Sequence, residues 1–224
     1  MIIHKEKHFA ICQKPTGVSS QKSSDGKKTM LELIGEELGI SPEAVHPIHR
    51  LDNPVGGTMV YAVTKEGARE LGKLVSENKM QKRYLAVLCG EPEEKEGILK
   101  DLLFKDSSKN KTYVVKRLRK GVKEASLEYK VLSAGNYNGK TYSLCEILLH
   151  TGRTHQIRVQ FASRKLPLTG DRRYGSGKDD LPLGLWCYSL EFDNPFNQNN
   201  HLIFKTEPDY SELPWSIFKI KEVK

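Results

Sequence analysis

The sequence predicts an α+β fold with a mixed, mainly antiparallel sheet flanked by helices and loops. Apolar and aromatic runs bounded by Gly, Pro, Asn or Asp, which are typical of strands, outnumber the stretches with helical spacing. The helical stretches interrupt pairs of strands singly and do not alternate regularly with them. The length of 224 residues, of which 38% are hydrophobic and 29% charged, indicates one domain over residues 1–224 with a substantial core.

Strands account for most of the predicted secondary structure. Each predicted strand is a short run rich in branched or aromatic side chains that ends at a turn-forming residue. The tail after Pro208 has no such pattern and is expected to be irregular. The predicted strands lie near residues 8–13, 57–63, 84–90, 112–117, 125–133, 142–149, 184–192 and 201–205.

Three segments have helical spacing. The first, residues 29–38, ends before a glycine, and the second, residues 64–78, begins at Thr64, whose hydroxyl suits an N-cap. A third helix is expected from about Thr154. The positions expected to face the core are Ala68, Leu71, Leu74 and Val75 in the second helix and Ile157 and Phe161 in the third.

Composition limits the classes of function. No run approaches the roughly 18 apolar residues of a membrane span, and the opening MIIHKEKHF lacks the apolar stretch of a secretory signal. The cysteines lie far apart in apolar runs, which excludes the close spacing of a zinc site and predicts reduced core thiols. We therefore expect a cytoplasmic protein without a membrane contact or a metal. The cysteines are Cys12, Cys89, Cys145 and Cys187.

The charge pattern points to a polyanionic partner. The chain carries a net charge of +8, as expected of a protein that meets phosphate backbones. The segment from Lys105 to Lys123 has eight basic residues and one acidic residue, a net +7. It is interpreted either as a solvated hairpin or as an arm that contacts RNA phosphates. Its candidate RNA-binding residues are Lys116, Arg117, Arg119 and Lys120.

The segment IHRLDNPVGGTMVYAVTKEG combines basic side chains, one carboxylate and a glycine turn before a hydrophobic strand. Arg50 and Asp52 lie where a loop is held by a strand, a common place for reactive groups. Taken by itself, the segment also fits a structural role in which Asp52 only begins a turn at Asp-Asn-Pro.

The segment LLHTGRTHQIRVQFA passes from a strand into a helix through a cluster of hydrogen-bond donors. A helix N-terminus of this kind suits an RNA phosphate or a buried carboxylate. The candidates are Arg153 and His155 before the helix and Arg158 in its first turn. The alternative is that Arg153 and His155 are surface groups.

Several blocks occur in a fixed order: HRLD, KRYLAVLCG, TGRTHQIRV, PLTGDRRYG and LWCYSLEF, with an early KPTG and a late LPWSIF. In this order the chain resembles the RluA-type pseudouridine synthases over residues 8–218. The resemblance implies the pseudouridine synthase fold, with an active-site cleft across the sheet. It also implies an isomerase that converts specific uridines of structured RNA to pseudouridine.

The resemblance assigns roles to four residues. Asp52, which closes HRLD, is the catalytic carboxylate, and Arg158, which ends HQIR, is its ion-pair partner. Tyr84 of the KRY block stacks on the target base. Arg50 enters the RNA stack where that base leaves, because a target base inside a stacked RNA must be turned outwards.

The implied reaction needs no redox change, so no cofactor or metal is expected. The N1–C1′ bond breaks, uracil turns within the pocket, and C5 bonds to C1′. Asp52 attacks C1′, attacks C6, or removes the ribose 2′ proton, and the sequence leaves these three routes open. Asp171 and Tyr174 of GDRRYG are expected to shape the pocket wall or an RNA loop.

The chain departs from the family pattern at a few positions. Val55 and Gly56 replace the expected Thr and Ser after HRLD, and three expected histidines are replaced by Gln160, Trp186 and Asn194. The proposed catalytic residues are retained. The departures therefore concern the choice of substrate and the positioning of groups more than the reaction.

Two other functions fit parts of the pattern. A catalytically dead RNA-binding module would have lost Asp52, Tyr84 or Arg158, and a nucleoside or nucleic-acid glycosidase would need a second carboxylate as general acid. The short stretch before Asp52 leaves no room for an S4-type RNA-binding domain, which resembles the stand-alone family members. We expect a monomer acting on an rRNA or tRNA stem-loop, with the choice between them open.

Overall fold

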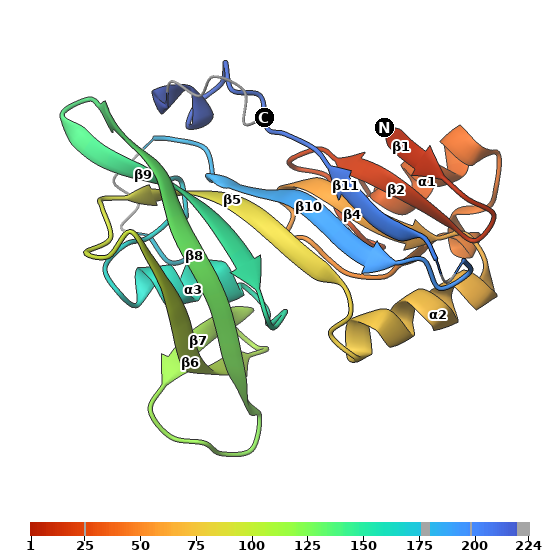
Figure 1. Ribbon diagram of the computed structural model, residues 1–224, viewed down its shortest axis with the longest axis horizontal. Helices are drawn as coiled ribbons and strands as arrows, with labels where there is room; N and C mark the ends of the chain where they lie inside the picture. Colours follow the sequence, from red (N-terminus) through yellow and green to blue (C-terminus); the bar gives the residue numbers. More distant parts are fainter. Residues whose placement is uncertain (25, 176–179, 198, 219–224) are drawn as a thin grey trace. The chain divides into compact units, whose positions relative to one another are not determined.

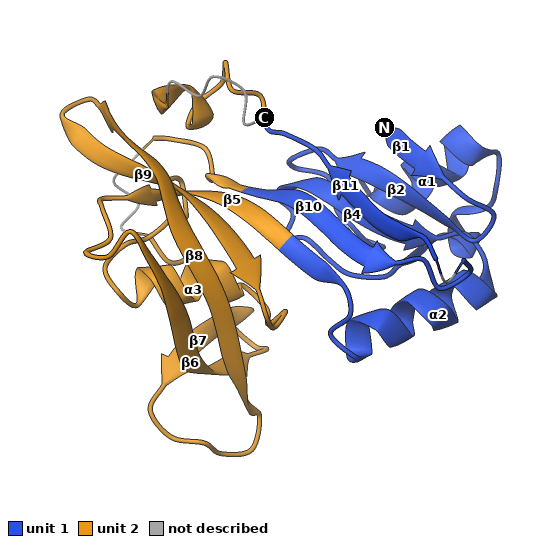
Figure 2. Cartoon of the chain, viewed as in Figure 1, with its two compact units in different colours: residues 1–82, 186–208 blue, residues 83–185, 209–224 orange. Residues whose placement is uncertain are grey.

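The computed structural model describes residues 1–24, 26–175, 180–197 and 199–218. The chain divides into two compact units, drawn in blue and orange in Figure 2. Unit 1 comprises residues 1–82 and 186–208, and unit 2 comprises residues 83–185 and 209–224. That both units act as the one domain predicted for residues 1–224 stays a prediction.

Unit 1 is built on a mixed sheet in the strand order β1-β2-β4-β10, with β11 paired to β10 and β3 to β4 (Figure 1). The β10–β4 pair is parallel, and the other pairs are antiparallel. Its elements are β1 (Ile2–Lys5), β2 (Phe9–Lys14), α1 (Met30–Leu38), a 3₁₀ turn (Pro42–Ala44), β3 (His46–Pro47), β4 (Gly56–Ala62), α2 (Lys65–Ser76), β10 (Leu185–Asp193) and β11 (His201–Lys205).

The two helices of unit 1 begin as the sequence predicts. The backbone N–H of Thr29 donates to the Glu32 carboxylate at 2.6 Å, which forms part of a capping box at the start of α1. At the start of α2 the Thr64 hydroxyl accepts a hydrogen bond from the Gly67 N–H at 3.0 Å. Leu71 of α2 is fully buried. These caps fix both helix starts within a residue of the expected positions.

Unit 2 contains an antiparallel sheet in the order β5-β9-β8-β6-β7, with α3 packed against β6 and β7 (Figure 1). The β8–β9 hairpin closes at Asn138 and Gly139, both with positive φ, as an Asn-Gly turn requires. Its elements are β5 (Gln81–Cys89), β6 (Glu96–Asp106), β7 (Lys111–Val115), β8 (Val122–Tyr137), β9 (Lys140–Leu149), α3 (Gln156–Ala162) and a 3₁₀ turn (Trp215–Ile217).

The predicted α+β fold with a mixed sheet is confirmed, and all eight predicted strands are present within a few residues. Strands β1, β3 and β6 were not predicted. The apolar residues of β6 do not alternate with polar ones along the sequence, so no strand was predicted there. Leu99 and Leu103 are buried in the structure, whereas Ile98 is exposed. The pairing of β6 with β8 and β7 therefore depends on contacts distant in sequence.

Helix α3 begins at Gln156, two residues later than predicted, because His155 has a left-handed φ of 53°. Ile157 and Phe161 are buried as expected. The tail after Pro208 contains only the 3₁₀ turn within the described residues.

The cysteines are thiols, and three of them, Cys12, Cys145 and Cys187, are buried as predicted. Burial raises the pKa of Cys12 and of Cys145 to about 12, so both are protonated at neutral pH. In the part of the chain that the structure describes, no helix is long and apolar enough to cross a membrane.

Candidate active site

Asp52 lies on a tight turn just before β4 in unit 1. The Val55 N–H donates to the Asp52 carbonyl at 2.9 Å, which closes the turn, and the Asp52 side chain is half-buried. Arg50 is exposed, with its guanidinium 3.3 Å from the Gln21 side-chain oxygen. The turn thus carries a half-buried carboxylate, with an exposed cation two residues before it.

A fully buried lysine supports this turn from below. The Lys14 ammonium donates to the carbonyls of Pro15, Asn53 and Val55 at 2.9, 3.1 and 2.7 Å. Burial lowers the pKa of Lys14 to about 8, and the charge of Asp52 opposes that shift. In the sequence, KPTG marks only the family resemblance, and no local pattern around Lys14 predicts this role.

His49 fixes the other side of the HRLD motif. It is buried, and its Nε2 accepts a hydrogen bond from the Val60 N–H of β4 at 3.3 Å. Burial, with a smaller effect of the Lys82 charge, lowers the pKa of His49 to about 3. The ring is therefore neutral and serves as an anchor between the motif and β4.

Tyr84 lies on β5 with its side chain buried. The preceding Arg83 points to the opposite face of the strand, as successive strand residues do, and pairs with Glu146 at 3.1 Å. Burial also lowers the pKa of Lys82, which shares the Tyr84 face by the same alternation. Of these three side chains Tyr84 is the most deeply buried, and its stacking on the target base stays a prediction.

Arg158 of α3 is held by a carboxylate within unit 2. Its Nε and Nη2 donate to the two oxygens of Asp171 at 2.7 and 2.8 Å, and both side chains are buried. Burial alone would raise the pKa of Asp171, but hydrogen bonds and the charge of Arg158 lower it below its usual value. Because Asp52 and Arg158 belong to different units, the predicted Asp52–Arg158 ion pair stays a prediction.

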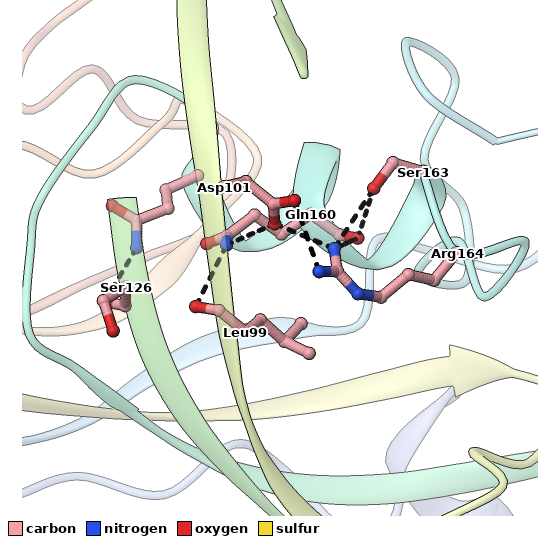
Figure 3. Close-up of polar contacts among 7 residues, drawn as sticks. Leu99, Asp101, Ser126, Gln160, Ser163 and Arg164 are labelled. Carbon is pink, nitrogen blue, oxygen red and sulfur yellow. Dashed lines mark hydrogen bonds and ion pairs between the residues drawn. The ribbon is translucent and has the colours of Figure 1, made fainter. Parts of the chain in front are cut away.

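Two glutamines fix the rotation of α3, and with it the direction of Arg158. Gln156 Nε2 donates to the Ser126 carbonyl of β8 at 3.1 Å. Gln160 Nε2 donates to the Leu99 carbonyl at 3.3 Å and to the Asp101 carboxylate at 2.7 Å, both on β6 (Figure 3). Since the two glutamines are four residues apart, they share one face of the helix.

The donors of the TGRTH loop are engaged within the protein. The Arg153 N–H and the Thr151 hydroxyl both donate to the Gln156 side-chain oxygen, at 3.0 and 2.8 Å. The Arg153 side chain donates to the Glu124 carbonyl, and His155 Nδ1 lies 2.8 Å from the Tyr174 hydroxyl. Of the two partners expected for this donor-rich helix start, a buried carboxylate is present, because Asp171 binds Arg158. An RNA contact by Arg153 and His155 stays a prediction.

The basic segment forms a hairpin in unit 2. It covers the end of β6, a turn at 107–110, all of β7 and the loop to β8. Its candidate phosphate contacts are all exposed, and the guanidinium of Arg119 lies 5.0 Å from the centre of the Phe104 ring. The hairpin geometry fits both interpretations of the segment. The exposed candidates are Lys116, Arg117, Arg119 and Lys120.

Comparison with known proteins decides the family. The sequence profile described as RNA pseudouridylate synthase matches residues 8–163, which include Asp52, Tyr84 and Arg158. The chain belongs to the RNA pseudouridylate synthase family. It is thus an isomerase that acts on RNA, of the RluA type that the ordered motifs predict.

Relatives of this synthase carry different substrates in their names. The chain is 31% identical to a tRNA pseudouridine synthase C of Vibrio parahaemolyticus, over 93% of this chain and 90% of the relative. It is 32% identical to a ribosomal large subunit pseudouridine synthase C of Buchnera aphidicola, over 91% of this chain but only 65% of the relative. The human RNA pseudouridylate synthase domain containing 1 has the same fold, with a TM-score of 0.78 at 22% identity, over 93% of this chain and 83% of the human chain.

The departures of this synthase from the family motifs have structural explanations. A side chain at Gly56 would place its Cβ 2.2 Å from the ring of Trp186, so two of the departures lie against each other. The Asn194 amide donates to the Glu6 carboxylate at 3.1 and 3.0 Å, and Gln160 binds β6 as described above. Each replacement is a buried packing or hydrogen-bonding position of the synthase.

No group of three or more His, Cys, Asp or Glu residues within the described ranges is arranged to hold a metal ion.

Proposed function

We propose that this synthase isomerises specific uridines in structured tRNA or rRNA, with Asp52 as its catalytic carboxylate. The observation that carries the proposal is the turn at Asp52, closed by the Val55 N–H and supported by the buried Lys14. Lys14 donates its hydrogen bonds to backbone carbonyls. The backbone of the turn is therefore held in place, and the Asp52 side chain on it is half-buried.

In this proposal Asp52 reacts in its ionised form. It attacks C1′ or C6 of the target nucleotide, or removes the 2′ proton, and all three routes need a charged carboxylate. Arg158 favours that charge and orients it, since a guanidinium next to a carboxylate stabilises the ionised form. Tyr84 supplies a flat face for the target base. The uracil stays bound between bond breaking and re-attachment, so the pocket must exclude water.

RNA binding in this proposal combines base flipping with phosphate contacts. Arg50 is exposed two residues before Asp52, where a guanidinium can fill the space left by a flipped nucleotide. The exposed cations of the basic hairpin contact phosphates and give a salt-sensitive affinity. Arg153 and His155, at the start of α3, add further contacts to the RNA.

The RNA is a stem-loop of tRNA or rRNA, as the names of the relatives from Vibrio and Buchnera suggest. We propose that the synthase works in the cytoplasm, where these RNAs and reduced cysteines are found, and acts as a monomer without a small-molecule cofactor. Loop and splayed-base recognition is typical of such RNA targets.

The decisive variant is Asp52→Asn, which keeps the shape of the side chain but removes its charge and nucleophilicity. We expect it to fold and bind RNA as the wild type does, but to lose turnover. The assay uses tRNA and rRNA fragments with tritium at C5 of uridine, because bonding of C5 to C1′ releases that tritium.

The matched control is Asp193→Asn, which removes the same charge from an exposed side chain of the same unit. It should release tritium at the wild-type rate. Substantial tritium release by Asp52→Asn would overturn the assignment of Asp52. Release of free uracil by the wild type would instead indicate a glycosidase.

A further inference from the structure

One short segment of unit 2, residues 168–174, contacts both the basic hairpin and Arg158. Its hairpin end is Tyr174, whose hydroxyl accepts a hydrogen bond from the Thr112 N–H at 2.8 Å. Strand β7 is the last strand of this sheet, so its outward N–H groups have no neighbouring strand. Tyr174 therefore binds the edge of the hairpin where a further strand would otherwise pair.

Arg173 makes a second attachment to the hairpin, at its turn. Its guanidinium donates to the carbonyls of Lys109 and Asn110 at 3.2 and 2.7 Å. The same turn is closed from inside by the Asp106 carboxylate, which accepts hydrogen bonds from the Ser108 and Lys109 N–H groups. The turn is thus rigid before any RNA binds.

The other end of the segment holds Arg158. Asp171 binds the guanidinium through both oxygens, and its Oδ1 also accepts hydrogen bonds from the Arg173 and Tyr174 N–H groups at 3.0 Å each. The Tyr174 ring centre lies 5.4 Å from the Arg158 guanidinium and 5.4 Å from the Lys111 ammonium on β7. One ring therefore contacts a cation of the hairpin and the guanidinium of α3.

The segment is also anchored to β5, the strand of Tyr84. Leu168 forms a bridge with Leu88, and the Thr169 N–H donates to the Val87 carbonyl at 2.9 Å. The Tyr174 ring packs against the buried Leu103, Ala125 and Val159. Because its base and its ring are both fixed, the segment behaves as a stiff connection between its two ends.

We propose that Asp171, Arg173 and Tyr174 form a positioning bridge, through which the hairpin that binds RNA phosphates sets the guanidinium of Arg158 for catalysis. The proposal rests on the proposed function, which assigns RNA contact to the hairpin and catalysis to Arg158. In this proposal the three bridge residues are positioning residues that act on the reaction through Arg158.

The bridge is tested with two neighbouring arginines, of which Arg173 contacts the hairpin turn and Arg172 serves as the control. Arg172 and Arg173 are both exposed and carry the same charge, but Arg173 holds the hairpin turn. Arg172→Met and Arg173→Met are compared for kcat and KM on one stem-loop RNA by tritium release, at one salt concentration. Melting temperatures of both variants are measured alongside.

We expect the loss of charge to raise KM similarly in both variants. Only Arg173→Met should lower kcat, by about tenfold, because it also loses two hydrogen bonds to a charged group. Arg173→Lys, which can still donate to the turn carbonyls, should recover most of kcat. A purely structural role would lower the melting temperature without separating kcat from KM.

Equal kcat in Arg172→Met and Arg173→Met, together with an inactive Arg158→Met, would overturn the bridge and leave the proposed function intact. A fully active Arg158→Met would overturn the proposed role of Arg158 and the bridge with it. Tyr174→Phe provides a second test, because it keeps the ring beside Arg158 but removes the hydroxyl that accepts a hydrogen bond from the Thr112 N–H. Wild-type kcat in Tyr174→Phe would also count against the bridge.

Discussion

Each unit of this synthase contains a buried cation at its candidate site, and the two cations have different hydrogen-bond partners. Lys14 in unit 1 donates to three neutral carbonyls around the Asp52 turn. Arg158 in unit 2 donates two parallel hydrogen bonds to the Asp171 carboxylate. The groups that accept these hydrogen bonds from Lys14 are thus uncharged, whereas Arg158 is part of a buried ion pair.

This difference predicts opposite responses to pH. An arginine keeps its charge at any pH a protein tolerates, so the Arg158 pair depends on the ionisation of Asp171 and fails only in acid. A lysine loses its proton when burial is not balanced by a counter-charge. Loss of the Lys14 proton at alkaline pH therefore removes the cost of burying its charge, whereas the stability from the Arg158 pair is lost in acid.

The largest effect is expected from Asp171→Asn. It leaves a buried guanidinium without its carboxylate, and breaking a buried pair in this way costs about 3–5 kcal/mol of unfolding free energy. The measurement is urea unfolding at several pH values. The pKa of folded Asp171 is lowered, so its contribution is complete above the unfolded pKa of about 3.9 and is lost as pH falls through the folded pKa.

The matched control combines Asp171→Asn with Arg158→Met. With both charges removed, much of the lost stability should return, because an uncompensated buried charge causes most of the cost. A double variant that is no more stable than Asp171→Asn would mean that packing, and not charge, holds this position.

A smaller loss is expected from Lys14→Met. The Asn53 carbonyl keeps the Gly17 N–H at 2.9 Å, but those of Pro15 and Val55 lose the ammonium, which should cost about 2–4 kcal/mol. Because the folded pKa of about 8 lies below the unfolded 10.5, the unfolded chain binds more protons between these values. The unfolding free energy of the wild type therefore rises with pH between these values. The difference in unfolding free energy between the wild type and Lys14→Met should widen from pH 8 towards pH 10.5.

This prediction is checked by unfolding both proteins in urea at pH 7, 8.5 and 9.5. A deficit that stays constant or shrinks as pH rises would mean that Lys14 titrates as an exposed lysine does. Tritium release at the same pH values then shows whether the turn loosens along with the lost proton.

The smallest effect is expected from Arg164→Met. Arg164 pairs with Asp101 at 2.8 Å as Arg158 pairs with Asp171, but its side chain is 35% exposed. Solvent screening limits such pairs to less than about 1 kcal/mol. A loss comparable to that of Asp171→Asn would mean that Gln160, which shares the Asp101 carboxylate, depends on Arg164 for its position.

The sequence predicted what depends on local pattern. Strand runs, the cap at Thr64 and the Asp52 turn all follow from residues close together in the chain. Strand β6 was missed because its apolar residues face the core only through pairing with β7 and β8.

The supports of the candidate site were harder to predict. Lys14 contacts backbone carbonyls about forty residues away, and no side-chain pattern encodes a carbonyl partner. For Arg158 the sequence predicts a pair with Asp52, which stays a prediction, and it does not predict the pair with Asp171. The charge of GDRRYG was visible, but its proximity to HQIR arises only from the packing of α3.

The contact between Gly56 and Trp186 restricts how this lineage of synthases can have changed. With Trp186 present, even one added carbon at position 56 would lie within the indole ring, while the indole nitrogen donates to the Thr206 carbonyl at 2.9 Å. Trp186 therefore requires a glycine at position 56. Replacing Gly56 by the family serine would bring a Cβ within 2.2 Å of the indole ring. The two positions are coupled, so a side chain at position 56 is tolerated only with a smaller residue at position 186.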